Sequence, residues 1–234
     1  MFSESAKFYD RIYSFKDYSK EASQVHEAIE SHRTTNGGRL LDVACGTGKH
    51  LAEFAKWYQV WGLDLDANLL ALARSAAPSA RLLQGDMRTF KLDQQFDAVT
   101  CLFSSIGYMT TKADLKLAIR NMADHLQPGG VLVIEPWLYP ENFISDHLHM
   151  LTVDDEDCKI VRLSRGTREG HLSLLDFEYL IMTAEETIRA SERHETGLYT
   201  RDEYGAAMVD AGLTVEYDPI GLMNRGLFIG TKPA

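Results

Sequence analysis

The sequence predicts an α/β protein built on a doubly wound, mostly parallel sheet, with an antiparallel β insertion after the fifth strand. Three observations lead to this fold class. Short apolar runs alternate with helical segments between residues 39 and 135, a glycine turn follows the first run, and strand-like alternation of apolar and polar residues appears after residue 136. Alternating strands and helices are typical of parallel sheets covered by helices. Such sheets bind ligands at the carboxyl ends of their strands.

The strands of the core are expected where the apolar runs lie. They cover residues 39–44, 60–65, 80–84, 96–103 and 131–135. Continuous apolar runs of this length are typical of strands that are buried on both faces. Helices are expected at residues 49–58, from Asp66 to about Ser75, and at 112–126, where Pro128-Gly129-Gly130 ends the last one. The first 32 residues are expected to form an amphipathic helical extension.

The insertion is expected to consist of antiparallel strands at residues 158–165, 172–182 and 187–198. A helix near 201–211 and strands near 213–217 and 226–231 then complete the sheet. The insertion is too long for an ordinary connection, and long insertions at an active-site edge are commonly lids or interfaces. The expected organisation is a helical extension and substrate cap (1–38), a cofactor-binding core (39–136), an antiparallel β lid or dimer insertion (137–200) and the C-terminal part of the core sheet (201–234).

Composition excludes several classes of partner. The formal net charge is -10, and Lys and Arg are scattered, so neither nucleic acid nor a membrane surface is an expected partner. No secretory signal is expected at the N-terminus, and no apolar run approaches the about 20 residues needed to cross a bilayer. The three cysteines, Cys45, Cys101 and Cys158, lack the spacing of a disulfide pair or a metal site. A cytoplasmic protein is therefore expected, and one well-placed Arg still allows an anionic small substrate.

A ligand-binding turn is expected after the first strand, where Gly46 and Gly48 stand between the strand and the next helix. Glycines let such a turn bend tightly and let a ligand approach the backbone. An ordinary strand-to-helix turn is the alternative reading. Asp64 at the end of the second strand could accept hydrogen bonds from ribose hydroxyls, and Asp86 with Met87 after the third could hold an adenine.

NAD is the alternative cofactor, because dinucleotide sites share the first two of these features. The complete G-x-G-x-x-G pattern is absent, since Leu51 occupies the position of the third glycine. That glycine permits close packing of helix and strand in dinucleotide-binding proteins. The pattern therefore favours a different nucleotide-like cofactor.

The chain resembles the class I S-adenosylmethionine-dependent methyltransferases in three successive motifs, Asp42-Val43-Ala44-Cys45-Gly46-Thr47-Gly48, Gly62-Leu63-Asp64 and Gly85-Asp86-Met87-Arg88. The resemblance covers roughly residues 39 to 136. It implies a Rossmann-like, seven-stranded sheet with an antiparallel last strand, S-adenosylmethionine as cofactor and S-adenosylhomocysteine as product. The cofactor-binding residues that it implies are Asp42, Ala44, Gly46, Gly48, Asp64, Asp86 and Met87.

A narrower resemblance, over almost the whole chain, is to the N,N-dimethyltransferases of nucleotide-linked (dTDP) amino sugars. It rests on Tyr9-Asp10 through Tyr13, Lys16-Asp17-Tyr18, Phe103 to Tyr108, Glu135-Pro136-Trp137 with Pro140 to Phe143, Arg168-Glu169-Gly170 and Arg225-Gly226-Leu227-Phe228. Those enzymes methylate a sugar amine twice and commonly form dimers. The chain departs from the family at Leu222-Met223-Asn224 and Ser14-Phe15, which replace glycine- or serine-containing stretches near the expected substrate.

Methyl transfer needs alignment of the reactants and exclusion of water, and it needs no covalent nucleophile. The resemblance places Tyr13 over the cofactor, where its hydroxyl could accept a hydrogen bond from the substrate amine. Packing of Tyr13 on the core is the alternative. Glu135 and Tyr108 follow core strands and are expected to contact the substrate, and Lys16 is expected to bind it. Arg225 could hold a diphosphate through its bidentate fork, or could be a surface arginine.

Three other features have a simpler interpretation. His147 and His149 could share one face of a strand, but the chain shows no third metal ligand at a suitable spacing, so no metal is expected. The acidic run from Asp154 to Asp157 is expected to be a solvated turn. The aromatic residues of the N-terminal segment could cap the cleft or form the apolar face of a helix, and they are Phe8, Tyr9, Tyr13, Phe15 and Tyr18.

These features predict an S-adenosylmethionine-dependent N-methyltransferase that modifies, once or twice, the amine of a nucleotide-linked amino deoxysugar. The alternatives are a methyltransferase of another small amine or hydroxyl compound, and a non-catalytic protein that binds S-adenosylmethionine. The resemblance makes a homodimer the candidate assembly.

Overall fold

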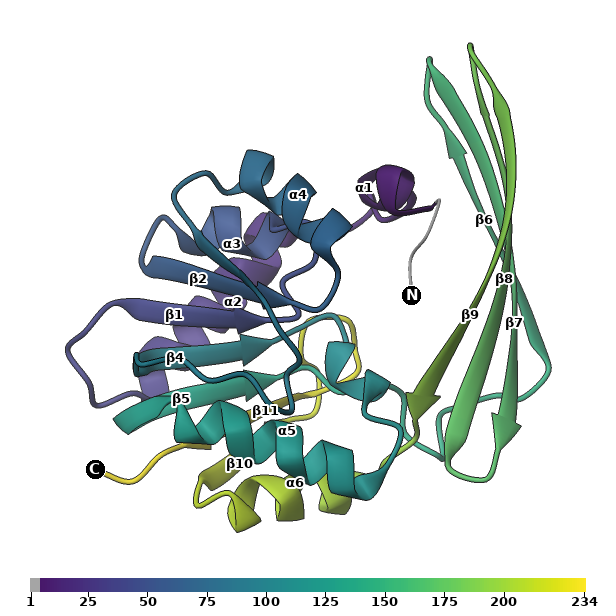
Figure 1. The fold of residues 1–234 in the computed structure, drawn as a ribbon. Helices are drawn as coiled ribbons and strands as arrows, with labels where there is room; N and C mark the ends of the chain where they lie inside the picture. The colour runs from purple at the N-terminus through teal and green to yellow at the C-terminus, as the bar shows by residue number, and fades with distance from the viewer. Residues whose placement is uncertain (1–4) are drawn as a thin grey trace.

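The computed structural model describes residues 5–234 and confirms the predicted fold class. A seven-stranded sheet has the order β10-β11-β5-β4-β1-β2-β3, and a separate four-stranded antiparallel sheet has the order β6-β7-β8-β9 (Figure 1). In the first sheet, β11 runs antiparallel to both of its neighbours, β5 and β10. The chain enters the second sheet after the fifth strand, as the sequence predicts.

The strands of the large sheet are β1 (Arg39–Val43), β2 (Gln59–Asp64), β3 (Arg81–Gln84), β4 (Phe96–Cys101), β5 (Leu126–Ile134), β10 (Thr214–Asp218) and β11 (Leu227–Thr231). The second sheet consists of β6 (His147–Asp154), β7 (Cys158–Glu169), β8 (Leu172–Thr183) and β9 (Thr187–Gly197). The helices are η1 (Ser5–Phe8), α1 (Tyr9–Ile12), α2 (Tyr18–His32), α3 (Lys49–Phe54), α4 (Ala67–Ala76), η2 (Ser105–Tyr108), α5 (Lys112–Asp124) and α6 (Arg201–Asp210).

Several predicted boundaries are wrong for local reasons. The helix predicted at 112–126 ends at Asp124, and β5 begins at Leu126, ahead of Pro128-Gly129-Gly130. These residues form an irregular start of the strand, where the pairing with β4 shifts register and Gly129 has a φ of +79°. The helix predicted at 49–58 ends at Phe54. Strand β6 was not predicted.

The described part of the N-terminal extension is helical, as predicted, and its helices are interrupted. It forms the short α1 and the longer α2, which are separated by residues 13–17. The side chain of Asp17 accepts a hydrogen bond from the backbone N–H of Lys20, 3.0 Å away, and so caps α2. Because this cap starts a new helix, the chain can change direction and place Tyr13 away from the axis of α2.

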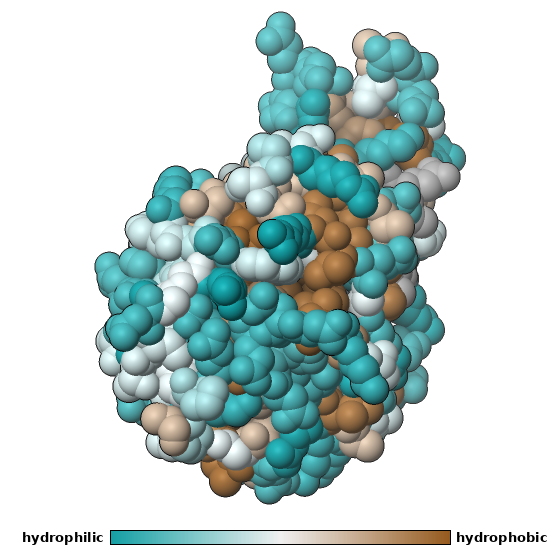
Figure 2. All heavy atoms as spheres, turned by 60° about the vertical axis from the view of Figure 1, so that its left-hand side comes forward, coloured by the Kyte–Doolittle hydropathy of each residue, from teal (hydrophilic) through white to brown (hydrophobic). Residues whose placement is uncertain are grey.

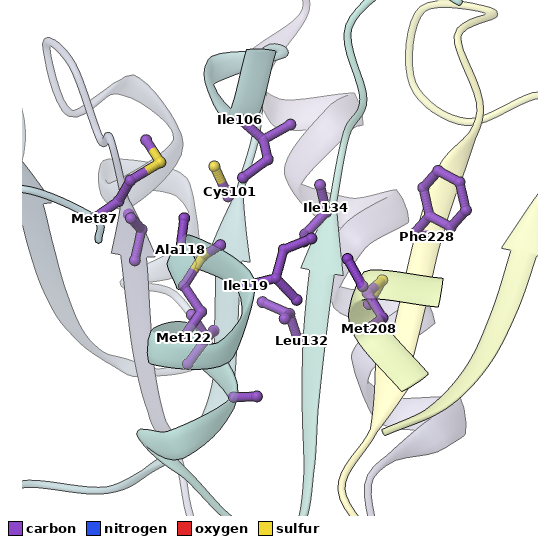
Figure 3. Packing of buried hydrophobic residues seen from close by; sticks show 14 of the residues in the cluster. Met87, Cys101, Ile106, Ala118, Ile119, Met122, Leu132, Ile134, Met208 and Phe228 are labelled. Atoms are coloured by element: carbon purple, nitrogen blue, oxygen red, sulfur yellow. The ribbon is translucent and has the colours of Figure 1, made fainter. Parts of the chain in front are cut away.

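Helices cover both faces of the large sheet. On one face, Ala118, Ile119 and Met122 of α5 and Met208 of α6 pack against Ile134 of β5 and its neighbours (Figure 3). On the other face, the apolar sides of α2, α3 and α4 bury the alternate strand residues. This double cover explains why the core strands read as continuous apolar runs rather than alternating ones.

The carboxyl ends of the parallel strands point toward the four-stranded sheet, and α1 lies between α4 and β6 (Figure 1). Ile12 of α1 packs against one face of the four-stranded sheet, here called the inner face. It contacts the cluster formed there by Cys158, Ile160 and Ile181. The opposite, outer face carries exposed apolar side chains. In the part of the chain that the structure describes, no helix is long and apolar enough to cross a membrane.

The acidic run between β6 and β7 is not simply solvated, which corrects the expectation from the sequence. The guanidinium of Arg11 in α1 donates hydrogen bonds to both carboxylate oxygens of Asp157, at 2.6 and 2.8 Å, and to Asp155 at 3.3 Å. The arginine lowers the pKa of the Asp157 carboxyl. The turn therefore anchors α1 to the four-stranded sheet.

Asp42 is a buried carboxylic acid in the middle of this fold. It is 2% exposed in β1, and its carboxylate accepts a hydrogen bond from the Thr100 hydroxyl of β4 at 2.7 Å. Burial raises the pKa of Asp42 to about 6; the charge of His50 and the Thr100 hydrogen bond oppose this rise. An ordinary Asp has a pKa of about 3.9. Ionisation of Asp42 therefore destabilises the folded state as the pH rises from about 4 to 6.

We expect the substitution Asp42→Asn to abolish this titration. Two pKa units correspond to about 3 kcal/mol, so the free energy of unfolding of the variant, relative to the native protein, should increase by about 2–3 kcal/mol between pH 4 and pH 7. Urea denaturation at several pH values measures this difference. The exposed Asp146→Asn variant is the control. A difference between Asp42→Asn and the native protein that is constant over this pH range would contradict the assignment.

Candidate active site

The turn after β1 has an unusual backbone and an open face. Ala44, Gly46 and Gly48 all have positive φ angles, of 60°, 56° and 79°. A Cβ atom on Gly46 would meet nothing within 4 Å, whereas one on Gly48 would lie 3.0 Å from the Cβ of Ala73 in α4. Gly48 thus allows α4 to approach closely, and Gly46 leaves its backbone open to a ligand. A non-glycine residue in this conformation, here Ala44, is typical of functional turns.

Asp64 fastens this turn to the end of β2. It is 8% exposed, and its carboxylate accepts hydrogen bonds from the backbone N–H groups of Gly46 at 2.8 Å and Asp66 at 2.9 Å. Burial raises the pKa of Asp64, while these two hydrogen bonds oppose the rise. A carboxylate oxygen can accept more than one hydrogen bond, so Asp64 retains acceptor capacity beside the open turn.

The other predicted cofactor residues have partners in the protein. Asp86 is bound by the guanidinium of Arg88, whose Nε lies 3.0 Å from its carboxylate, and this lowers the pKa of Asp86. Met87 is 9% exposed and packs into the core beside Ala118 (Figure 3). Asp42 lies beneath the turn with its carboxylate directed at β4, so any effect on a ligand would pass through the backbone.

Tyr13 connects three parts of the molecule. It follows α1, and its ring meets the ring of Phe103, beyond β4, edge to face with centres 5.0 Å apart. Its hydroxyl accepts a hydrogen bond from the guanidinium of Arg162 on β7, at 3.1 Å. The N-terminal extension, the core and the four-stranded sheet therefore meet at this side chain.

Glu135 follows β5 and is fully buried, with an exposed fraction of 0%. One carboxylate oxygen accepts a hydrogen bond from the backbone N–H of Phe103 at 2.6 Å, and the other is buried without a hydrogen-bond partner among the described residues. Burial raises the pKa of Glu135, and the charges of Lys16 and Arg225 oppose this. Phe103 and Ser104 have φ angles of 51° and 61°, so this loop is held in a strained backbone conformation.

Lys16 is enclosed rather than open to a cleft. Its ammonium lies 2.8 Å from a carboxylate oxygen of Glu21, and the other oxygen of Glu21 lies 2.9 Å from Nε2 of His50. The same ammonium lies 3.9 Å from the centre of the Phe103 ring. Its charge is therefore paired with Glu21 and its side chain is buried, so in this structure Lys16 supports the Phe103 loop.

Tyr108 and Arg225 border the same loop. The hydroxyl of Tyr108 lies 2.7 Å from Nδ1 of His194 on the inner face, and burial raises its pKa. Arg225 donates a hydrogen bond to the Ser104 hydroxyl at 2.9 Å and stacks on the Trp137 ring at 5.0 Å. Arg225 is partly buried and bonded to Ser104, unlike an ordinary surface arginine, and burial lowers its pKa.

The sequence did not single out Arg162 and His194. Alternation predicts that residues 158–165 form a strand, but it does not show what each face contacts. The signal was present, since Arg162 falls in the same alternating row as Cys158 and Ile160. A charged residue in an apolar row of a strand indicates either a partner or a site.

Tyr13 lies at the junction between the core and the four-stranded sheet, where it contacts Phe103 and Arg162. Figure 2 shows apolar residues concentrated between the rounded core and the part of the molecule that projects above it. Asp10 fixes α1 to the turn after β1, because it accepts a hydrogen bond from the Thr47 hydroxyl at 2.7 Å and pairs with Lys49 at 3.2 Å. Within residues 5–234, no three His, Cys, Asp or Glu side chains are grouped as a metal site would require.

Comparison with known proteins identifies the family of this site. Residues 40–130 match a family model described as a methyltransferase domain. The dTDP-3-amino-3,6-dideoxy-alpha-D-glucopyranose N,N-dimethyltransferase of Streptomyces fradiae is 41% identical, over 99% of this chain and 92% of that protein. The dTDP-3-amino-3,4,6-trideoxy-alpha-D-glucopyranose N,N-dimethyltransferase of Streptomyces venezuelae is 40% identical, over 97% of each chain.

Solved structures agree along the full length. The crystal structure of Streptomyces venezuelae DesVI superimposes with a TM-score of 0.93 at 39% identity, covering 100% of both chains. CalS10 of Micromonospora echinaspora, an amino pentose methyltransferase solved with S-adenosylmethionine bound, gives a TM-score of 0.87 at 39% identity over 99% of this chain and 98% of that one. The chain therefore belongs to the S-adenosylmethionine-dependent methyltransferases, in the family of the dTDP-amino-sugar N,N-dimethyltransferases.

Proposed function

We propose that this methyltransferase transfers one or two methyl groups to the amine of a nucleotide-linked amino deoxysugar. The observation that supports this most strongly is the position of Tyr13. Its hydroxyl lies where the loops at the carboxyl ends of β4 and β5 face the inner side of the four-stranded sheet. A small substrate enclosed there would lie between the cofactor turn and a lid. The close relatives act on dTDP-linked amino sugars.

The residues around the first turn fit S-adenosylmethionine. The open backbone at Gly46 offers space for the methionine part, and the carboxylate of Asp64 has acceptor capacity for ribose hydroxyls. Ala44 and Gly48 shape the turn, Asp42 supports it from below, and Asp86 and Met87 would border the adenine. When bound, the cofactor supplies the electrophilic methyl carbon.

The residues of the chain then act by orientation and exclusion of water. A Tyr13 hydroxyl that accepts a hydrogen bond from an amine N–H leaves the nitrogen lone pair free for attack. The amine must be neutral, so its proton leaves to solvent or to a nearby base before the transfer. Glu135 and Tyr108 are proposed to contact the sugar, and Arg225 to bind the negatively charged part of the substrate.

Two further assignments belong to this proposal. We place the enzyme in the cytoplasm, and we propose that it forms a homodimer through the outer face of the four-stranded sheet. Exposed apolar side chains lie in neighbouring rows there, with 73% of Leu148, 63% of Met150 and 50% of Leu163 exposed. Contiguous apolar surface of this kind is typical of interfaces, and a two-fold axis would bury the same patch on both copies.

The activity is tested with S-adenosylmethionine and the dTDP-3-amino-3,6-dideoxyglucose substrate named for the Streptomyces fradiae relative. Mass spectrometry should show the sugar gaining the mass of one or two methyl groups. Arg225→Ala should raise KM for the sugar nucleotide about 10- to 100-fold, because a hydrogen bond to a charged group contributes about 1.5–3 kcal/mol, and should leave S-adenosylhomocysteine affinity unchanged. Methylation of free amino acids instead would contradict the assigned substrate, and no turnover with any amine would indicate a non-catalytic binding protein.

The dimer is tested by light scattering after gel filtration. The native protein should have the mass of two chains, and Leu163→Lys should have the mass of one, because a lysine charge cannot be buried without a partner. Ile220→Lys replaces a side chain that is 65% exposed and lies outside the four-stranded sheet, so it serves as the control. A monomeric native protein, or a dimer that survives Leu163→Lys, would refute the proposed interface.

A further inference from the structure

Arg162 is a buried cation with little to neutralise it. The residue lies in β7 on the inner face of the four-stranded sheet and is 7% exposed. Its hydrogen-bond partner is the neutral hydroxyl of Tyr13, at 3.1 Å. Its Nε is buried without a hydrogen-bond partner, and no carboxylate of the described residues lies within ion-pair distance of it.

Other arginines of the protein behave differently. Arg11 pairs with Asp157 at 2.6 Å, and Arg193 pairs with Asp176 at 2.6 Å, although both arginine side chains are exposed to water, by 37% and 58%. A guanidinium that is removed from water needs a counter-charge much more than an exposed one does. Among the described residues, Arg162 therefore holds a buried positive charge with no carboxylate at ion-pair distance, which is the electrostatic signature of an anion site.

The surroundings keep this guanidinium in a fixed orientation. Its carbon lies 5.4 Å from the centre of the Tyr13 ring and 5.1 Å from that of Phe177. Two aromatic contacts of this kind hold a planar cation in place, but they do not supply acceptors for its N–H groups. Those groups are arranged to donate in pairs to oxygen atoms, the geometry that phosphate groups accept.

The site also faces the reaction centre from the side opposite the core. Arg225 comes from the loop before β11 and donates a hydrogen bond to Ser104, the neighbour of the Phe103 residue whose ring meets that of Tyr13. Arg162 reaches the same tyrosine from the four-stranded sheet. One arginine thus contacts Tyr13 from the four-stranded sheet, and the other lies on the core side, beside the Phe103 loop that Tyr13 packs against.

We propose that Arg162 binds the diphosphate of the nucleotide-linked substrate from the four-stranded sheet, an inference that rests on the proposed function. The diphosphate supplies the missing counter-charge, so the sheet and the core are held together across the substrate. The Tyr13 hydroxyl accepts a hydrogen bond from one N–H group of the guanidinium, and the phosphate oxygens accept hydrogen bonds from the others. Together with Arg225 on the core side, Arg162 then lets this chain distinguish a sugar nucleotide from an unphosphorylated amino sugar.

Calorimetric titration with dTDP in the presence of S-adenosylhomocysteine tests the site. Arg162→Gln should weaken dTDP binding at least 10-fold and should leave thymidine binding unchanged, because thymidine lacks the diphosphate. The control is Arg74→Gln, an exposed arginine in the last turn of α4 that lies outside both the four-stranded sheet and the proposed dimer interface. This control should bind dTDP within twofold of the native protein.

The Tyr13→Phe variant distinguishes two roles of Arg162: direct binding of the diphosphate, and positioning of the Tyr13 side chain. It removes the acceptor of the Arg162 hydrogen bond, and it should lower kcat while dTDP affinity stays within twofold. If Tyr13→Phe weakens dTDP as much as Arg162→Gln does, Arg162 acts through Tyr13 and the diphosphate site is refuted. Unchanged dTDP affinity in Arg162→Gln refutes it as well, and methylation of the sugar nucleotide by the native enzyme would then leave the proposed function intact.

Two further measurements complete the test. If Arg162→Gln fails to bind S-adenosylhomocysteine and is misfolded, Arg162→Lys decides, because a lysine keeps the charge and loses the paired donors. It should weaken dTDP at least threefold, and native-like affinity would contradict the proposal. A native protein that binds neither dTDP nor inorganic pyrophosphate overturns both this site and the assigned substrate class.

Discussion

The parallel pairing of the core strands is the constraint on which the site depends. β1 pairs with both β2 and β4, and β4 pairs with β5, so these four strands end at the same edge of the sheet. Residues distant in sequence are brought together there, and the Gly46–Asp64 hydrogen bond fixes the turn after β1 to the end of β2. The Phe103–Glu135 hydrogen bond does the same for the loops after β4 and β5. The chemistry therefore follows from strand direction and register.

Helix α1 covers this edge of the large sheet, and its neighbouring residues contact different parts of the molecule. Asp10 contacts the turn of the core, Arg11 contacts the tip of the four-stranded sheet, and Ile12 is buried against its inner face. Exposed ion pairs contribute only about 0–1 kcal/mol each, whereas full burial of an isoleucine contributes about 1.5–3 kcal/mol. The apolar contact at Ile12 thus holds the segment in place, and the charged pairs on either side orient it. As a result, Tyr13 lies at the junction between the core and the four-stranded sheet, between Phe103 and Arg162.

The sequence sufficed for the fold class, the carboxyl ends of the strands and the glycine turn after β1, since apolar runs and glycine spacing are local signals. It was less informative about partners that the tertiary fold creates. Lys16 looked like a substrate ligand, but the break between α1 and α2 turns its ammonium onto Glu21. Met223, in a stretch that departs from the family pattern, places its sulfur 3.3 Å from the same ammonium. Arg162 could not be assigned to the site, because alternation alone does not show which face of β7 meets Tyr13.

Function in this account depends on a substrate enclosed between two sheets, with the cofactor at the edge of one and the diphosphate held by the other. The most direct measurement is a crystal structure of the complex with S-adenosylhomocysteine and dTDP. The account predicts the homocysteine part beside Gly46, and the diphosphate between the inner face of the four-stranded sheet and the core, within hydrogen-bond distance of Arg162. A nucleotide on the outer face, or at the amino ends of the strands, would contradict it.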